Sequence, residues 1–223
     1  MTTITDNVAS VRERIAQAAE RAGRASGEIM LIAVTKKQSA ASVRQVIAAG
    51  VGAIGENYVQ EAIVKRAELS ELTAQWHLLG HLQSNKAAVA GRTFNLIQSV
   101  DSTRLSLLLG QQASAAGRHQ QILLQVHLGD EATKTGVPTA LAADMAAQIS
   151  EMPGVTLCGL MGIAPLGQPA RPYFRSLRCL FEALPLSQRQ ILSMGMTADY
   201  ETAIEEGSTL VRIGTAIFGP RPI

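Results

Sequence analysis

The amino-acid sequence predicts an α/β protein folded as a single (β/α)8 TIM barrel, and three observations favour this fold class. Eight short apolar runs alternate with helix-favouring stretches along the 223 residues. Aromatic residues are scarce (Phe 4, Trp 1, Tyr 3) although 47% of the chain is hydrophobic, so the core is aliphatic, as in helices and parallel strands. No linker, repeat or change in composition divides the chain. The alternative is an open, doubly wound sheet.

The eight apolar runs are the expected strands. Several are apolar at nearly every position, as at 31–34, which is typical of strands buried on both faces. Glycines such as Gly50, Gly117 and Gly207 stand where a helix gives way to a strand. The expected strands are residues 30–36, 53–56, 75–79, 95–99, 121–127, 155–161, 190–194 and 209–213, and three of the expected helices are 41–49, 101–116 and 139–151.

The segment before the first strand predicts an amphipathic helix that packs on the barrel. Asp6 can cap this helix, apolar residues recur in it at helical spacing, and Gly23 can end it. We therefore expect residues 1–24 to form an extra N-terminal helix within one domain of residues 1–223.

Charge and cysteine content exclude several classes of protein. The net charge is only +2, and its basic residues are scattered, so nucleic acid is not an expected partner. Cys158 and Cys179 are expected to be buried, reduced thiols. His77 and His81 are four residues apart, a spacing that brings two ligands together only on a helix, and this stretch is expected to be a strand and a loop, so no zinc site is expected. The first residues show neither the basic nor the apolar region typical of a signal peptide, and no apolar run approaches the ~18 residues of a membrane span. We expect a cytoplasmic protein that does not enter a membrane.

Lys36 is the first candidate functional residue, because barrel proteins carry their sites where strands end. Alternation places Ile32, Val34 and Lys36 on one side of the first strand. An inward lysine among apolar neighbours should have a lowered pKa, and a neutral amine is what Schiff-base formation with an aldehyde requires. The alternative is a solvated or ion-paired lysine at the rim.

The ends of the last two strands carry glycine and hydroxyl residues suited to a phosphate group. Ser193 stands beside Gly195, and Gly214 precedes Thr215, in the loops that often hold phosphate in barrels. Arg212 would be a buried cation near that ligand, or else an ion-pair partner of a rim carboxylate such as that of Glu56. Opposite an inward lysine, these loops favour a phosphorylated aldehyde as ligand.

The same segments make the chain similar to a known family. They are AVTK at 33–36, GENYVQE at 55–61, WHLLGHLQSNK at 76–86, GLM at 159–161, SMGM at 193–196 and GSTLVRIGTAIFG at 207–219. They span nearly the whole chain. The chain resembles the pyridoxal 5′-phosphate (PLP) homeostasis proteins, single-domain relatives of the fold-type III barrels of alanine racemase. It departs from their usual pattern at Leu78, Leu79 and His81, and its segment 164–175 is short, which affects the expected rim.

The resemblance implies a cofactor site for PLP. Lys36 would carry the cofactor as an internal aldimine, and Arg212 would face the pyridine nitrogen. The phosphate would be held by Ser193, Gly214 and Thr215. Asn57 and Met161 would line the pocket, and the residues nearby would be His81, Asn85, Lys134 and Met194.

The resemblance also implies a binding function in place of catalysis. An arginine donates to the pyridine nitrogen and leaves it unprotonated, which makes the ring a poorer electron sink. Racemase relatives draw a second base from an added domain, and this chain ends at Ile223. We expect a monomeric protein that holds PLP reversibly, buffers its free level and so maintains intracellular vitamin B6 and amino-acid homeostasis, with PLP-dependent apoenzymes as its expected partners. The alternatives are a PLP-dependent racemase or decarboxylase, and a Schiff-base aldolase without cofactor.

Overall fold

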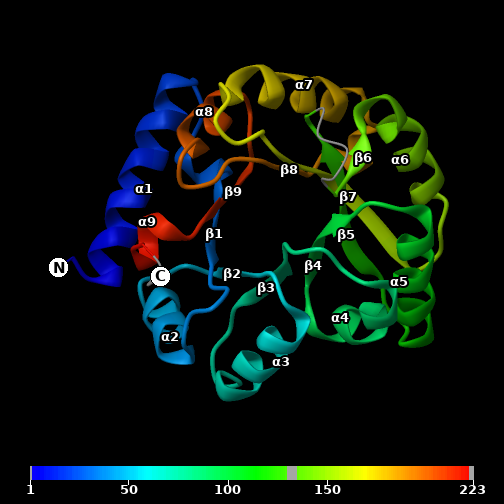
Figure 1. Ribbon diagram of the computed structural model, residues 1–223, viewed down its shortest axis with the longest axis horizontal. Coiled ribbons are helices and arrows are strands. Elements are labelled where there is room, and N and C mark those ends of the chain that lie inside the picture. The colour runs from blue at the N-terminus through cyan, green and yellow to red at the C-terminus, as the bar shows by residue number, and fades with distance from the viewer. Residues whose placement is uncertain (1, 130–134, 221–223) are drawn as a thin grey trace.

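A computed structural model describes residues 2–129 and 135–220 of the chain. Its strands form a ring surrounded by helices (Figure 1). The strands of the ring are β1 (Met30–Val34), β2 (Ala53–Glu56), β3 (Gln75–Leu78), β4 (Leu96–Val100), β5 (Gln120–His127), β7 (Val155–Ile163), β8 (Ile191–Ser193) and β9 (Leu210–Ile213). A short strand, β6 (Val137–Pro138), pairs with β5 in addition.

The ring is a closed barrel of parallel strands. Neighbours follow the order β4-β3-β2-β1-β9-β8-β7-β5, and β5 pairs back to β4. The first strand therefore lies beside the last one, with Ile32 opposite Arg212. Closure confirms the predicted (β/α)8 barrel and excludes the open sheet, and it brings the ends of β1 and β9 together on one rim.

Two apolar layers hold the barrel together. Inside the ring, Leu96, Leu123, Cys158 and Met161 pack in one cluster. A much larger core lies between the strands and the helices and includes most other buried aliphatic residues, such as Leu192. Burying this aliphatic surface is the main favourable term in folding, and it uses strands that are apolar on both faces.

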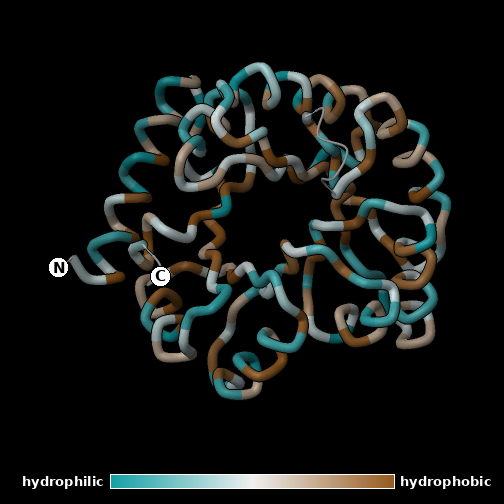
Figure 2. The backbone as a smooth tube through the Cα atoms, viewed as in Figure 1, coloured by the Kyte–Doolittle hydropathy of each residue, from teal (hydrophilic) through white to brown (hydrophobic). Residues whose placement is uncertain are grey.

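The helices surround the barrel and follow its strands in chain order. They are α1 (Ile4–Arg21), α2 (Ala40–Ala48), α3 (Val59–Glu68), α4 (Ala87–Thr93), α5 (Thr103–Ala115), α6 (Ala142–Ser150), α7 (Ala170–Ala183), α8 (Tyr200–Glu205) and α9 (Thr215–Phe218), and 3₁₀ turns occupy Ser26–Glu28, Ser84–Lys86, Thr139–Leu141 and Leu186–Gln188. Hydrophilic and hydrophobic residues alternate along these helices (Figure 2). Among the described residues, no helix is both long and apolar enough to cross a bilayer.

The N-terminal helix α1 lies against the barrel, as the sequence predicts, and packs on α2, α8 and α9. Its cap is Thr3, however, and not Asp6: the Thr3 hydroxyl accepts the Asp6 amide, and the Asp6 carboxylate accepts the Thr3 amide. This reciprocal capping box starts the helix earlier than expected. Gly23, at φ +67°, follows the helix end as predicted.

Two other expectations need correction. The first strand ends at Val34, so Thr35 and Lys36 lie in the turn that follows and not in the strand. Hydrogen bonds from neighbouring elements hold this turn. Cys158 is buried as expected, but Cys179 is exposed on α7, because it lies on the solvent side of that amphipathic helix.

Gly80 is required by close backbone packing beside the site. A β-carbon at this position would lie 2.2 Å from the carbonyl oxygen of Asn57. We expect Gly80→Ala to lower the free energy of unfolding by at least about 2 kcal/mol, since the backbone of Asn57 must move. Gly27→Ala is the control, because a β-carbon there meets nothing within 4 Å, and its effect should stay within about 0.5 kcal/mol. Equal denaturation midpoints for the two variants would contradict this account.

Candidate cofactor site

Lys36 follows the carboxyl end of β1 at the rim where β1 lies between β2 and β9. Its side chain is half-buried, and the next residue, Lys37, adopts φ +62°. A left-handed backbone is uncommon for a residue other than glycine, so the surrounding contacts must hold this turn.

Ion pairs and hydrogen bonds, some of them buried, hold the turn around Lys36. We call these contacts the Lys65 clamp, which is formed by Thr35, Lys37, Glu56, Glu61 and Lys65. The Lys65 ammonium donates to the Thr35 carbonyl at 2.6 Å, to Glu56 Oε1 at 2.8 Å and to Glu61 Oε1 at 2.7 Å. The Thr35 hydroxyl donates to Glu56 Oε1 at 2.6 Å, and the Lys37 amide donates to Glu61 Oε1 at 2.5 Å. The clamp therefore fixes the backbone on both sides of Lys36.

Glu56 is the buried centre of the clamp. Desolvation raises the pKa of its carboxyl above the ordinary value, and hydrogen bonds from Lys65 and Thr35 oppose that rise. Its second oxygen, Oε2, has no hydrogen-bond partner in the described structure. Because Glu56 pairs with Lys65, the alternative pairing of Glu56 with Arg212 is wrong.

Arg212 is a buried cation in the barrel interior, with 4% of its surface exposed. Its Nη1 donates to the Ser193 hydroxyl at 2.5 Å and its Nη2 to the Gly162 carbonyl at 2.9 Å. No carboxylate within the described ranges forms an ion pair with it. Burial lowers its pKa to about 10, and the charge of Asp199 opposes this shift. The guanidinium therefore stays charged at neutral pH and can stabilise a ligand atom that accepts a proton or carries negative charge.

The loops after β8 and β9 meet at the same rim. Gly195 adopts φ +92°, and a β-carbon there would lie 2.5 Å from that of Ala203, so no other residue fits this turn. The Ala216 amide donates to the Thr197 hydroxyl at 3.4 Å and joins the two loops. Gly214 and exposed Thr215 begin α9, and the phosphate contact expected of them stays a prediction.

Ser193 lies in the interior but is already engaged. Its hydroxyl donates to Gln98 Oε1 at 2.7 Å and accepts from Arg212. The single hydroxyl proton is therefore used, and Ser193 orients Arg212. Its predicted contact with a phosphate is untested.

The two candidate methionines lie on opposite sides of the barrel wall. Met161 packs inside the ring, on the side expected for a pocket residue. Met194 packs with Leu192 in the outer core that faces the helices. Alternation explains this placement, since residues two apart share a face of a strand and its extension. The expected nearness of Met194 to the cofactor thus has no support from its side-chain direction.

The remaining candidates lie in rim loops. Asn57 is half-buried after β2, whereas His81 and Asn85 are exposed after β3. His81 Nδ1 lies 3.7 Å from an oxygen of Asp101, which ties two rim loops together. Lys134 lies outside the described residues. Within the described ranges, no group of three or more His, Cys, Asp or Glu side chains is placed to bind a metal.

Sequence reasoning missed two groups of residues near Lys36 and Arg212. One is the Lys65 clamp, whose only local signal is the i,i+4 pair of Glu61 and Lys65. The other is Gln98 with His77, which contact each other inside the ring. A glutamine within the apolar run of β4 is the signal that could have pointed to them.

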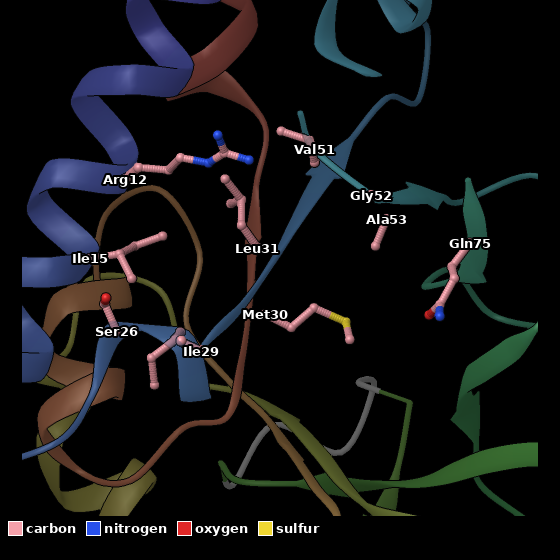
Figure 3. A pocket seen from close by; sticks show the side chains of 11 residues that line it. Arg12, Ile15, Ser26, Ile29, Met30, Leu31, Val51, Gly52, Ala53 and Gln75 are labelled. Carbon is pink, nitrogen blue, oxygen red and sulfur yellow. The ribbon is translucent and has the colours of Figure 1, made fainter. Parts of the chain in front are cut away.

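A cavity of about 420 Å³ opens at the opposite end of the barrel. It is lined by the first residues of three strands, Met30, Ala53 and Gln75, together with Arg12 of α1 (Figure 3). Since Lys36 and Arg212 belong to the carboxyl ends of strands, this cavity is separate from the candidate site.

The family model described as "Alanine racemase, N-terminal domain" matches residues 7–222. A Pseudomonas aeruginosa protein named pyridoxal phosphate homeostasis protein is 42% identical over 99% of this chain and 97% of its own length. The chain belongs to the pyridoxal phosphate homeostasis protein family.

Solved structures agree with this membership of the pyridoxal phosphate homeostasis family. PipY of Synechococcus elongatus, solved with PLP bound, is 40% identical, with a TM-score of 0.84 over 97% of this chain and all of that one. A histidine racemase of Leuconostoc mesenteroides is only 16% identical, and its TM-score of 0.73 shows a shared fold. That likeness covers 98% of this chain but 57% of the racemase.

The Lys65 clamp predicts a large loss on removing its ammonium. Lys65→Met leaves the buried Glu56 carboxylate without its cation, so we expect the free energy of unfolding to fall by about 3 kcal/mol or more. The control is Arg44→Met, which removes an exposed ion pair with Glu71 and should cost less than about 1 kcal/mol. Chemical denaturation measures both, and similar losses would show that the clamp does not hold the turn.

His77 predicts a pH dependence of stability. Burial lowers its pKa from the ordinary 6.5 to about 4, so between these values the unfolded chain binds a proton that the folded chain does not. The contribution of His77 to the free energy of unfolding is therefore present in full above pH 6.5. It is lost as the pH drops toward 4, by up to about 3 kcal/mol. Denaturation at several pH values should show this loss in the wild type and in His81→Asn, whose ring is exposed, but not in His77→Asn. Parallel pH profiles for all three proteins would refute this assignment.

Proposed function

We propose that this protein binds PLP reversibly through Lys36 and maintains its free level, and that it does so without turning over a substrate. One observation carries the proposal: the turn bearing Lys36 and the buried, charged Arg212 come from neighbouring strands and serve the same rim. The names of the curated relatives and the PLP-bound PipY structure support it.

The residues present fit the chemistry of PLP. Lys36 supplies an amine for its aldehyde, and Arg212 supplies a cationic donor for its ring nitrogen. Gly214 and Thr215, at the start of α9, supply donors for its phosphate. Ser193, the third residue expected at the phosphate, donates its hydroxyl proton to Gln98, so in this proposal it acts through Arg212. Asn57 and Met161 line the pocket in this proposal, with His81 and Asn85 at its edge. Met194, whose side chain packs in the outer core, adjoins the pocket only through its backbone in this proposal.

Each part of the site has a separate task. PLP, when bound, supplies an aldehyde that condenses reversibly with an amine. The Lys65 clamp fixes the backbone on either side of Lys36 and so limits the positions of its amine. Arg212 has donors only, so a nitrogen that faces it must accept and remain unprotonated. Withholding that proton disfavours carbanion chemistry and favours storage of the cofactor.

We further propose a cellular role consistent with storage. The protein acts as a monomeric domain of residues 1–223 in the cytoplasm, with residues 1–24 as its added helix, and it releases PLP to apoenzymes that depend on it. Neither nucleic acid nor a membrane is a partner in this proposal. No second base facing Lys36 is part of it, so the racemase alternative becomes an outcome of the test.

Lys36→Ala tests the covalent role of this lysine. We expect purified wild-type protein incubated with PLP to show the visible absorbance of a Schiff base, and we expect Lys36→Ala to lose it entirely. Lys37→Asn is the matched control, because it removes the adjacent ammonium while asparagine tolerates the positive φ. Absorbance spectra with and without borohydride reduction provide the measurement.

Two results would contradict the proposal. Unchanged absorbance in Lys36→Ala would place the cofactor on another amine. Exchange of an amino acid α-proton in D2O, at a rate above that of free PLP, would assign a racemase or related enzyme and remove the storage role.

A further inference from the structure

A chain of buried polar side chains runs through the barrel interior to Arg212. Arg212 Nη1 donates to the Ser193 hydroxyl at 2.5 Å, and that hydroxyl donates to Gln98 Oε1 at 2.7 Å. Gln98 Nε2 lies 3.1 Å from His77 Nδ1. All four side chains are buried, with at most 4% of each residue exposed. The chain thus connects β9, β8, β4 and β3 across the ring.

The hydrogen bonds of this chain run in one direction. Arginine can only donate, so the Ser193 oxygen accepts from Arg212 and its single proton points to Gln98. The Gln98 oxygen is then occupied, and its NH2 group faces His77. His77 Nδ1 must therefore accept, which places the ring proton on Nε2, 3.4 Å from Gln75 Oε1. Gln75 lies at the far mouth of the barrel, beside the cavity of Figure 3.

The direction of the chain requires a neutral His77. A proton on Nδ1 would face the NH2 group of Gln98 and break the contact between them. The lowered pKa of His77, caused by its burial, agrees with this requirement. The lowered pKa and the hydrogen-bond geometry are separate observations, and both give the same protonation state.

These hydrogen bonds matter because, among the residues that the structure describes, Arg212 has few other polar contacts. Its guanidinium donates to one hydroxyl and one backbone carbonyl, and both acceptors are neutral. If the Ser193 hydroxyl rotated, its proton would point toward the cation and repel it. The Gln98 oxygen prevents this rotation by accepting that proton, and His77 prevents the amide of Gln98 from turning over.

We infer that Gln98 and His77 are positioning residues of the cofactor site, which hold the Ser193 hydroxyl as an acceptor and thereby fix Arg212 toward the ring nitrogen of PLP. This inference rests on the proposed function, because that function gives Arg212 its ligand. Neither residue contacts PLP in this account. The row of hydrogen bonds determines where the donors of Arg212 point. Because its members other than Arg212 are neutral, it does not neutralise the charge of the guanidinium.

The competing explanation is that these polar groups only satisfy one another in the core. Under that explanation, variants should lose cofactor affinity only in proportion to lost stability. The two explanations can be separated by comparing a variant of a hydrogen-bonded residue with a variant of an apolar residue on the same strand and the same face. Leu96 provides that comparison, because it lies two positions before Gln98 on β4 and packs inside the ring without polar contacts.

The experiment titrates four full-length variants with PLP and follows Schiff-base absorbance and the rate of cofactor release. Gln98→Leu and His77→Leu interrupt this row of hydrogen bonds. We expect each variant to bind PLP about tenfold more weakly, because a misplaced Arg212 loses about one charge-assisted hydrogen bond to the ring nitrogen. His77→Asn restores an acceptor near Nδ1, so it should bind within about twofold of wild type. Leu96→Ala should lower thermal stability but keep wild-type affinity. Equal affinity of Gln98→Leu and wild type, or equal loss in Leu96→Ala, would overturn the inference.

A measurement on cofactor-free protein separates this inference from the proposed function. The ¹⁵N NMR signals of the four histidines report the protonation of each ring nitrogen. We expect His77 at neutral pH to carry its proton on Nε2. Gln98→Leu should shift the His77 signals more than those of the other three histidines. A proton on Nδ1 of His77 would contradict the inferred direction of these hydrogen bonds, even if PLP binds to Lys36. Conversely, if wild-type protein incubated with PLP shows no Schiff-base absorbance, the proposed function is refuted, whichever ring nitrogen of His77 carries the proton.

Discussion

The guanidinium of Arg212 lies buried in the barrel interior, and the acceptors that contact it, the Ser193 hydroxyl and the Gly162 carbonyl, are both neutral. Burying a charge without a counter-ion is costly, and ion pairs usually compensate for it. Here dipoles stabilise the cation but do not cancel its charge. A ligand that accepts a hydrogen bond or carries negative charge at this point is therefore stabilised strongly. The remaining features of the site make sense in relation to this cation.

Barrel closure joins this cation to Lys36. The first and last strands of the ring pair with each other, and that pairing puts Ile32 beside Arg212 and brings the turn bearing Lys36 to the same rim. The Lys65 clamp then fixes this turn from α3 and β2. The two halves of the site are thus held by different networks, one ionic and one neutral. Formation of the binding site depends on complete folding, because neither half is local in sequence.

The sequence predicted the barrel well because the strands are buried on both faces and leave an unbroken apolar signal. All eight expected strands are present, and 53–56 has the same bounds. Strand ends and the alternation of side chains pointed to Lys36 and Arg212, and the family resemblance gave their expected roles. Contacts between distant elements could not be predicted: Lys65 reaches Thr35 from a helix, and Gln98 reaches Ser193 across the ring. Periodicity shows which face a side chain occupies but does not show its partner on another strand.

The most direct test of this account is a crystal structure of the protein with PLP. We predict continuous electron density between the Lys36 side chain and the cofactor, with the Arg212 guanidinium donating to the ring nitrogen while Ser193 and Gln98 keep their present contact. Attachment of PLP to another lysine, or a ring nitrogen remote from Arg212, would contradict the account.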